Sequence, residues 1–324
     1  HGVVFAGASE VKTEKKVQLS TSSTNNVIIT GTKVYVNLAQ PERAEEVASQ
    51  DVDGVGLLRA EFIIAGMGKH PRLFIKEHRE QEFIDGLAKA LRKVCAAFGN
   101  RPVIYRATDF KTNEYRDLEG GKEFEPHEDN PMIGYRGCFR YMKEPDEFAM
   151  ELAAIKKVRE QFAMKNLYLM IPFVRTVREF QQVKKLVELS GLMQSRDFKL
   201  GIMCEVPSTV ILAEDFCKAG VDFFSIGSND LTQLTLGIDR DSPIVAEEFD
   251  ERDDAVMRSI ENVIKTCHKY NVKVSICGQA PSVYQEVTEK LIEFGIDSIS
   301  VNPDVIEKTR RTIASSEQRQ LLKK

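Results

Sequence analysis

Short apolar runs alternate with amphipathic stretches along most of the chain, beginning at Thr32. Runs that are apolar throughout indicate strands buried on both faces, as in parallel sheets. Eight such strands are predicted, at residues 33–38, 54–59, 102–108, 167–173, 199–206, 222–227, 273–277 and 298–302.

Between most of these strands, apolar residues recur at the spacing of a helix that buries one face. The clearest helical patterns cover residues 77–98, 146–163, 177–189 and 255–270. Eight strands, each followed by a helical stretch, predict an α/β fold, a closed (β/α)8 TIM barrel over residues 32–324. An open doubly wound sheet is the alternative, and the absence of a G-x-G-x-x-G turn after the first strand counts against it.

Composition narrows the class of protein. A net charge of −4 over 324 residues gives no reason to expect a nucleic acid partner. No apolar run approaches the ~20 residues of a membrane span, and no secretory signal opens the chain. The six cysteines include no Cys-x-x-Cys pair, which favours reduced thiols in a cytoplasmic protein. The polar stretch at residues 20–26 is typical of a linker, so residues 1–31 are predicted to precede the barrel.

Polar residues gather where five of the predicted strands end. Because the carboxyl ends of barrel strands share one face, we expect these residues to form a single site. Each has an ordinary explanation as well: a surface ion pair for an arginine, a helix N-cap for Asn229 or Asp230, and a small buried apolar side chain for Cys277. The residues at these strand ends are Arg59, Arg106, Glu205, Gly227, Ser228, Asn229, Asp230 and Cys277.

These residue types suit one kind of chemistry. Two arginines present planar forks that grip a phosphate or carboxylate and stay charged when desolvated. Glu205 and Asp230 offer Mg²⁺ two oxygen ligands, few enough to leave positions for substrate oxygens and water. A thiol at Cys277 can deliver a proton to carbon or remove one. The residues themselves predict Mg²⁺-dependent chemistry on a small phosphorylated or keto acid.

Several segments at these strand ends resemble the C-terminal domain of the phosphoenolpyruvate-utilising enzymes, which include phosphoenolpyruvate synthase, pyruvate phosphate dikinase and enzyme I of the sugar phosphotransferase system. The similarity runs in order over residues 32 to 315, and the run at 109–121 is most similar to the synthase branch. The matching segments are Gly54-Val-Gly-Leu-Leu-Arg-Ala-Glu-Phe62, Arg106-Ala-Thr-Asp-Phe-Lys-Thr-Asn-Glu-Tyr115, Asn130-Pro-Met-Ile-Gly-Tyr-Arg-Gly137, Met203-Cys-Glu-Val-Pro207, Ser225-Ile-Gly-Ser-Asn-Asp-Leu-Thr-Gln233 and Ile276-Cys-Gly-Gln279.

The resemblance implies a role for each site residue. One departure is Ala60, which stands where many family members carry threonine. By resemblance, Arg59 and Arg106 hold the phosphoryl group with help from Arg136, Glu205 and Asp230 bind Mg²⁺, Gly227, Ser228 and Asn229 form the substrate loop, Arg240 binds substrate, and Cys277 donates a proton to the enolate carbon.

A larger departure concerns histidine. Family members carry phosphate on a histidine in a Thr-x-x-Ser-His context, and none of the five histidines here has that context. His127 lies near the site segments, but its Glu-Pro-His-Glu-Asp surroundings indicate a solvated loop. The resemblance therefore implies a pyruvate- and phosphoenolpyruvate-binding half-site, with residues 1–31 as a remnant of the preceding phosphohistidine domain.

The partners implied are the phosphohistidine and ATP-grasp domains of a longer cytoplasmic enzyme, and a second copy of the chain in a homodimer. Within the family, the same domain of pyruvate phosphate dikinase or of enzyme I is the alternative. Two other functions stay open: a stand-alone lyase or aldolase acting on pyruvate enolate, and a non-catalytic dimerisation module. An intact set of Arg59, Arg106, Glu205, Asp230 and Cys277 counts against the last.

Overall fold

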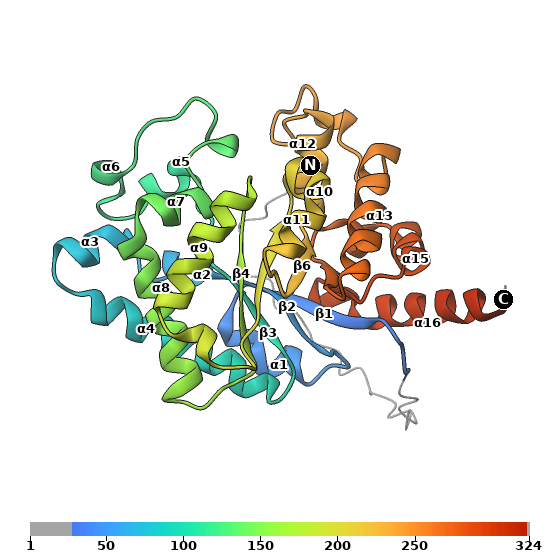
Figure 1. The fold of residues 1–324 in the computed structure, drawn as a ribbon, viewed down its shortest axis with the longest axis horizontal. Helices are drawn as coiled ribbons and strands as arrows, with labels where there is room; N and C mark the ends of the chain where they lie inside the picture. The colour runs from blue at the N-terminus through green and yellow to red at the C-terminus, as the bar shows by residue number, and fades with distance from the viewer. Residues whose placement is uncertain (1–27, 323–324) are drawn as a thin grey trace, which may run out of the picture.

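Eight parallel strands form a closed barrel in a computed structural model that describes residues 28–322 (Figure 1). Neighbours in sequence pair in order, and β1 pairs with β8 to close the ring. The predicted TIM barrel is confirmed. The strands are β1 (Lys33–Leu38), β2 (Gly54–Arg59), β3 (Val103–Arg106), β4 (Leu167–Ile171), β5 (Leu200–Cys204), β6 (Phe223–Ile226), β7 (Lys273–Ile276) and β8 (Ser298–Val301).

Several strands stop before the predicted ends. The apolar runs at 102–108 and 199–206 continue past Arg106 and Cys204, where the strands β3 and β5 end. Beyond those points the chain leaves the ladder and turns, which brings Asp109 and Glu205 over the end of the barrel. The strands predicted from the sequence are too long because the residues that follow them, at the end of the barrel, are also buried.

Side chains alternate between two cores, as the period of a strand requires. Outward-facing residues such as Phe224, Val274 and Ile276 pack between the barrel and its helices in one large cluster. Inward-facing residues form a second cluster, which we call the inner cluster, made of Leu57, Ile104, Met170, Met203 and Cys277.

Helices surround the barrel on all sides (Figure 1). The predicted helix at 77–98 begins only at Glu80, because His78 has a left-handed backbone with φ 56°. The predicted helix at 177–189 is confirmed to the residue. The helices that follow the strands include α1 (Ala44–Ala48), α4 (Glu80–Phe98), α8 (Pro145–Glu160), α9 (Val177–Leu189), α11 (Ala213–Lys218), α13 (Asp254–Lys269), α15 (Gln285–Phe294) and α16 (Ile306–Leu322).

Shorter helices build the loops at the carboxyl ends of the strands. The connection from β3 to β4 is the longest of these excursions and carries α5 (Thr112–Arg116), α6 (Gly121–Phe124) and α7 (Cys138–Lys143). In Figure 1 this excursion stands at the upper left, opposite α10 and α12 at the upper right. The other short helices are α2 (Ala60–Ala65), α3 (Pro71–Lys76), α10 (Pro207–Ile211), α12 (Ser228–Leu236) and α14 (Ala280–Val283).

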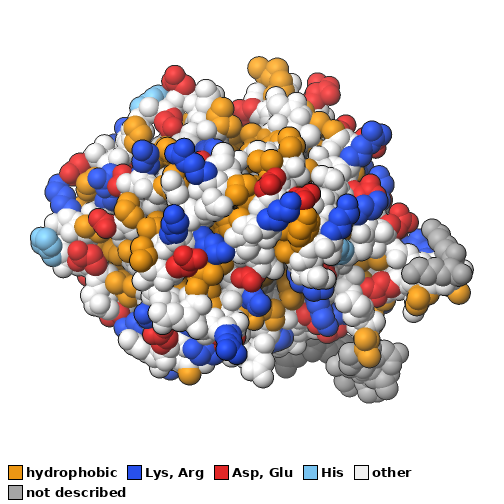
Figure 2. All heavy atoms as spheres, in the orientation of Figure 1, with side chains coloured by type: hydrophobic (Ala, Val, Ile, Leu, Met, Phe, Trp, Pro, Cys, Tyr) orange, Lys and Arg blue, Asp and Glu red, His pale blue; other side chains and the backbone are white. Residues whose placement is uncertain are grey.

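The distribution of charged side chains on the surface is consistent with the small net charge. Figure 2 shows acidic and basic side chains interspersed over the visible face, without a broad region of one sign. Among the described residues, no helix has the length and apolar character needed to cross a bilayer. Most of the predicted linker at 1–31, namely residues 1–27, lies outside the described residues.

Candidate functional site

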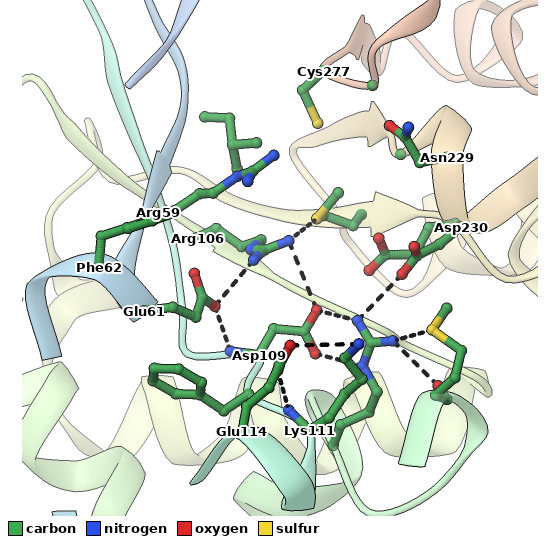
Figure 3. A pocket seen from close by; sticks show the side chains of 18 of the residues that line it. Arg59, Glu61, Phe62, Arg106, Asp109, Lys111, Glu114, Asn229, Asp230 and Cys277 are labelled. Carbon is green, nitrogen blue, oxygen red and sulfur yellow. Dashed lines mark hydrogen bonds and ion pairs between the residues drawn. The ribbon is translucent and has the colours of Figure 1, made fainter. Parts of the chain in front are cut away.

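A cavity of about 530 Å³ opens at the carboxyl end of the barrel, between the β3–β4 excursion and α12 (Figure 3). We call it the C-terminal cavity. Ser228 is the one predicted site residue missing from its wall, because its buried hydroxyl donates to Glu251 Oε1 at 2.5 Å. The predicted residues that do line the cavity are Arg59, Arg106, Arg136, Glu205, Gly227, Asn229, Asp230, Arg240 and Cys277.

The two strand-end arginines differ in how their charges are balanced. Arg106 Nη2 lies 3.0 Å from Glu61 Oε1, and its Nη1 lies 3.7 Å from Asp109 Oδ2. Arg59, by contrast, has no ion pair or side-chain hydrogen bond among the described residues, as Figure 3 also shows. Burial and the neighbouring charge of Arg106 lower the pKa of Arg59. The cavity therefore contains a partly buried guanidinium that forms no ion pair among the described residues, although the nearby charge of Glu61 favours its charged form.

Arg136 is fully engaged with protein groups. Its Nε and Nη2 donate to the two carboxylate oxygens of Asp109 at 3.0 and 2.6 Å, and Nη2 also lies 3.2 Å from Asp230 Oδ2. The guanidinium stacks over the ring of Phe173, 4.0 Å from its centroid. Burial acts to raise the pKa of Asp109, but the charges of Arg136 and Arg106 outweigh it, so the pKa is lowered. Arg136 thus joins the ends of β3 and β6.

Tight backbone geometry supports this contact. Phe173 adopts φ 47°, which is uncommon for a bulky residue and is found mostly where a site requires it. Gly137 follows Arg136 with φ 56°, and a Cβ there would lie 2.6 Å from Phe173 Cβ. The glycine lets the excursion approach β4 closely enough for Arg136 to reach Asp109.

Glu205 and Asp230 crowd their negative charges on one side of the cavity. Glu205 Oε1 accepts a hydrogen bond from the backbone N–H of Phe173 at 2.7 Å. Burial, and then the carboxylates of Asp230 and Asp109, raise the pKa of Glu205. Gly227 leaves room beside Glu205, since a Cβ there would lie 2.8 Å from Oε2. A bound cation would reduce the repulsion between these carboxylates.

The helix-cap alternative for Asn229 and Asp230 is wrong. Gly227 occupies the cap position of α12 without a side-chain cap. Asn229 Oδ1 instead accepts a hydrogen bond from the backbone N–H of Gln279 at 3.0 Å. Asp230 Oδ1 lies 3.1 Å from Arg240 Nη1, so this carboxylate faces the cavity and its cations.

Cys277 faces the barrel interior, as the alternation of β7 predicts. It is only 3% exposed and belongs to the inner cluster, whereas Ile276 belongs to the outer one. Burial raises the pKa of Cys277 to about 11, so the thiol is protonated at neutral pH. In Figure 3 its sulfur points into the cavity. Cys204 points the other way from Glu205, into the outer cluster.

These features coincide with a family match. A model of the PEP-binding domain of the PEP-utilising enzymes, where PEP is phosphoenolpyruvate, matches residues 12–318. The chain belongs to this family.

Curated relatives of this PEP-binding domain are named phosphoenolpyruvate synthase. That of Aeropyrum pernix is 49% identical over 100% of this chain and 41% of its own length. Those of Pyrococcus furiosus and Helicobacter pylori are 43% and 42% identical over 98% of this chain, and over 39% and 41% of their own lengths. The chain therefore spans about two fifths of the length of these relatives.

Solved structures confirm the fold of the PEP-binding domain. A malate synthase of Haloferax volcanii superposes with a TM-score of 0.55 at 10% identity, covering 88% of this chain and 69% of that one. A citrate lyase of Burkholderia xenovorans gives 0.50 at 15% identity, covering 90% and 78%. At these identities the likeness concerns the barrel alone.

Several charged residues of the PEP-binding domain were assigned no role from the sequence. Glu61 and Asp109 neutralise Arg106, and Asp109 also holds Arg136. Each follows a strand-end arginine by two or three positions, and this spacing was the available signal. Lys111 and Glu114, from the start of the excursion, also line the cavity. His127 is exposed and outside the cavity lining, in agreement with the predicted solvated loop.

Proposed function

We propose that the chain binds phosphoenolpyruvate and pyruvate with Mg²⁺ and transfers a phosphoryl group between the enolate oxygen and a histidine on another domain, as a phosphoenolpyruvate synthase. The observation that carries this proposal is the Arg59 guanidinium, which forms no ion pair among the described residues and lies beside Arg106 in the C-terminal cavity. A cation held in a desolvated cavity favours an anionic ligand, and a guanidinium fits phosphate in particular.

The carboxylates fit a magnesium ion. Glu205 Oε2 lies beside Gly227, and Asp230 Oδ1, which pairs with Arg240 at 3.1 Å, belongs to the cavity wall with it. Among the described residues, no group of three or more His, Cys, Asp or Glu side chains is arranged to hold a metal. Two protein ligands suit Mg²⁺, which keeps several positions for water and substrate oxygens. When bound, the ion would offset the negative charge of the enolate and phosphoryl oxygens.

The chain's own groups then have defined tasks. Arg59 and Arg106 hold the phosphoryl group, and Arg136 keeps Asp109 and Asp230 in place. In the direction of pyruvate formation, the phosphorus–oxygen bond of phosphoenolpyruvate breaks as a phosphorus–nitrogen bond forms on the histidine. The enolate carbon takes the proton of Cys277 and leaves a thiolate. The reverse direction returns that proton to sulfur before phosphoryl transfer.

The partners follow from the balance of this reaction. A histidine must enter the cavity from elsewhere, and a nucleotide-dependent domain must supply its phosphate. We call the assembly of this chain with its phosphohistidine and ATP-grasp domains the complete enzyme. We further propose that it is a cytoplasmic homodimer.

Calorimetry of phosphoenolpyruvate binding with Mg²⁺ tests the proposal. Replacing Arg59 by methionine keeps an unbranched apolar stem and removes the charged group, and loss of charge-assisted bonds should weaken binding by about 2–3 kcal/mol, or about 30- to 150-fold. Arg196 is exposed in the turn before β5, and Arg196→Met serves as the matched control with unchanged affinity. Wild-type affinity in a folded Arg59→Met protein would show that the guanidinium binds no phosphate.

A further inference from the structure

Three serines lie side by side inside the barrel, below Cys277. Ser225 of β6 pairs with Ser275 of β7, and Ser275 pairs with Ser298 of β8. Their neighbours Phe224, Ile226, Val274, Ile276 and Ile299 belong to the outer cluster, so all three serines face inward. We call these three residues the serine row.

Two members of the row have hydroxyl groups without a partner. Ser225 is fully buried and Ser275 is 5% exposed, and the Oγ atoms of both have no hydrogen-bond partner among the described residues. Buried hydroxyls are normally paired with protein or with ordered water. Hydroxyls on adjacent strands can bond each other directly, but these two do not, which leaves each of them able to bond a water. The row is therefore built to bind water.

The row lies between the two ends of the barrel. A second cavity, of about 640 Å³, lies at the amino ends of the strands and is lined by Ser275 and Ser298. Exposed lysines, including Lys199 and Lys273, also line this N-terminal cavity and connect it to solvent. At the other end, Cys277 follows Ser275 by two residues on the inner face of β7 and lines the C-terminal cavity.

The side chains of Cys277 and Ser225 lie next to each other and interact. Burial raises the pKa of the thiol to about 11, and the Ser225 hydroxyl offsets part of that rise. The contact falls short of a hydrogen bond, since Ser225 Oγ has no partner within hydrogen-bond limits. Cys277 Sγ lies 3.7 Å from the Ile226 carbonyl oxygen, to which the thiol can donate.

We propose that the serine row holds a chain of water molecules that passes protons between Cys277 and solvent at the N-terminal cavity. This inference rests on the proposed function, in which Cys277 becomes a thiolate after each protonation of the enolate. The C-terminal cavity is then occupied by product and covered by the incoming phosphohistidine domain. A route through the barrel restores the thiol without opening that side.

The proton balance is simple. The thiolate takes a proton from the water at Ser225, which breaks one O–H bond and forms the S–H bond. That water is restored by the next along the row, and the last is restored by solvent. One proton enters at the N-terminal cavity for each one that leaves Cys277. In the opposite direction of the reaction every transfer is reversed.

The test uses the double variant Ser225→Ala and Ser275→Ala in the complete enzyme. Exchange of pyruvate methyl protons with deuterated solvent is measured by NMR at saturating pyruvate and Mg²⁺. We expect the exchange rate to fall about 10²-fold, at the lower end of what acid–base assistance provides. Affinity for phosphoenolpyruvate should not change, because neither serine lines the C-terminal cavity. If the double variant does not fold, each single variant is expected to slow exchange in the same way.

A serine of β8 provides a matched control. Ser300 also faces the interior, but its hydroxyl donates to Asn37 Oδ1 at 2.7 Å. Ser300→Ala should retain exchange. A high-resolution crystal structure of the chain gives a second readout, with ordered water bridging Ser225 and Ser275 in the wild type and none in the double variant.

The outcomes separate the two proposals. If Cys277→Ser exchanges methyl protons at the wild-type rate, the proposed role of Cys277 fails and the water route fails with it. If exchange depends on Cys277 but the serine double variant matches the wild type, only the water route is overturned. A dry interior between Ser225 and Ser275 at high resolution would likewise overturn it and leave the proposed function intact.

Discussion

Replacing Asp109 by asparagine tests whether the Asp109–Arg136 pair holds the site together. The Asp109 side chain is 1% exposed, and it accepts from Arg136 at 3.0 and 2.6 Å while Arg106 lies 3.7 Å away. Asparagine keeps the shape and one acceptor oxygen, but it places an amide N–H₂ against a guanidinium donor. Breaking a buried pair costs about 3–5 kcal/mol, and the remaining contact of Arg136 with Asp230 sets our expectation at about 3 kcal/mol.

Urea unfolding of the chain, followed by circular dichroism, measures this loss. Asp250 provides a matched control, since it pairs with Arg252 through two bonds of 2.8 and 3.0 Å but is 42% exposed. Screening by solvent should make the effect of Asp250→Asn small. A loss of unfolding free energy below about 1 kcal/mol for Asp109→Asn would mean that the buried pair stabilises the fold no more than an exposed pair does. That result would refute the reasoning.

The same pair predicts a dependence on pH. Its cations lower the pKa of Asp109 in the folded chain, so the ionised carboxylate stabilises the fold above its unfolded pKa of about 4. That stability is lost as the pH falls through the folded value. The difference in unfolding free energy between wild type and Asp109→Asn should therefore be constant near neutral pH and shrink below about pH 4.

Two further substitutions address the proposed chemistry. Asp230→Asn should fold but need more Mg²⁺, because a charged oxygen ligand is lost while its shape is kept; an unchanged Mg²⁺ titration of phosphoenolpyruvate binding would remove Asp230 from the metal site. Cys277→Ser should bind phosphoenolpyruvate normally yet lose about 10²–10⁴-fold in the exchange of pyruvate methyl protons, because an alcohol is far less acidic than a thiol. Cys204→Ser, which changes an outward-facing thiol, should retain that exchange, and equal rates in both variants would make Cys277 a core residue.

The sequence pattern predicted the barrel because strands buried on both faces and amphipathic helices leave strong, regular signals. It also predicted which strand ends converge, since topology alone brings Arg59, Arg106 and Cys277 to one face. The pattern could not show that Arg106 forms an ion pair with Glu61 while Arg59 forms none among the described residues. That difference depends on side-chain placement within the turns after β2 and β3.

For a similar reason, the sequence pattern could not predict contacts between distant segments. Arg136 reaches Asp109 only because the β3–β4 excursion folds back over β4, with Gly137 in a left-handed conformation. No local propensity encodes such a closure. Ser228 shows the reverse error: its motif suggested a cavity residue, but its hydroxyl turns away to Glu251.

Closure of the barrel by β1 and β8 has a consequence for synthesis of the chain. Until Ser298–Val301 has been made, β1 and β7 each have an unpaired strand edge. Such edges can pair with other chains, and contacts between the two ends of a sequence form slowly. A nascent chain that stalls before β8 is therefore exposed to aggregation, and expression of fragments truncated before residue 298 should yield insoluble protein.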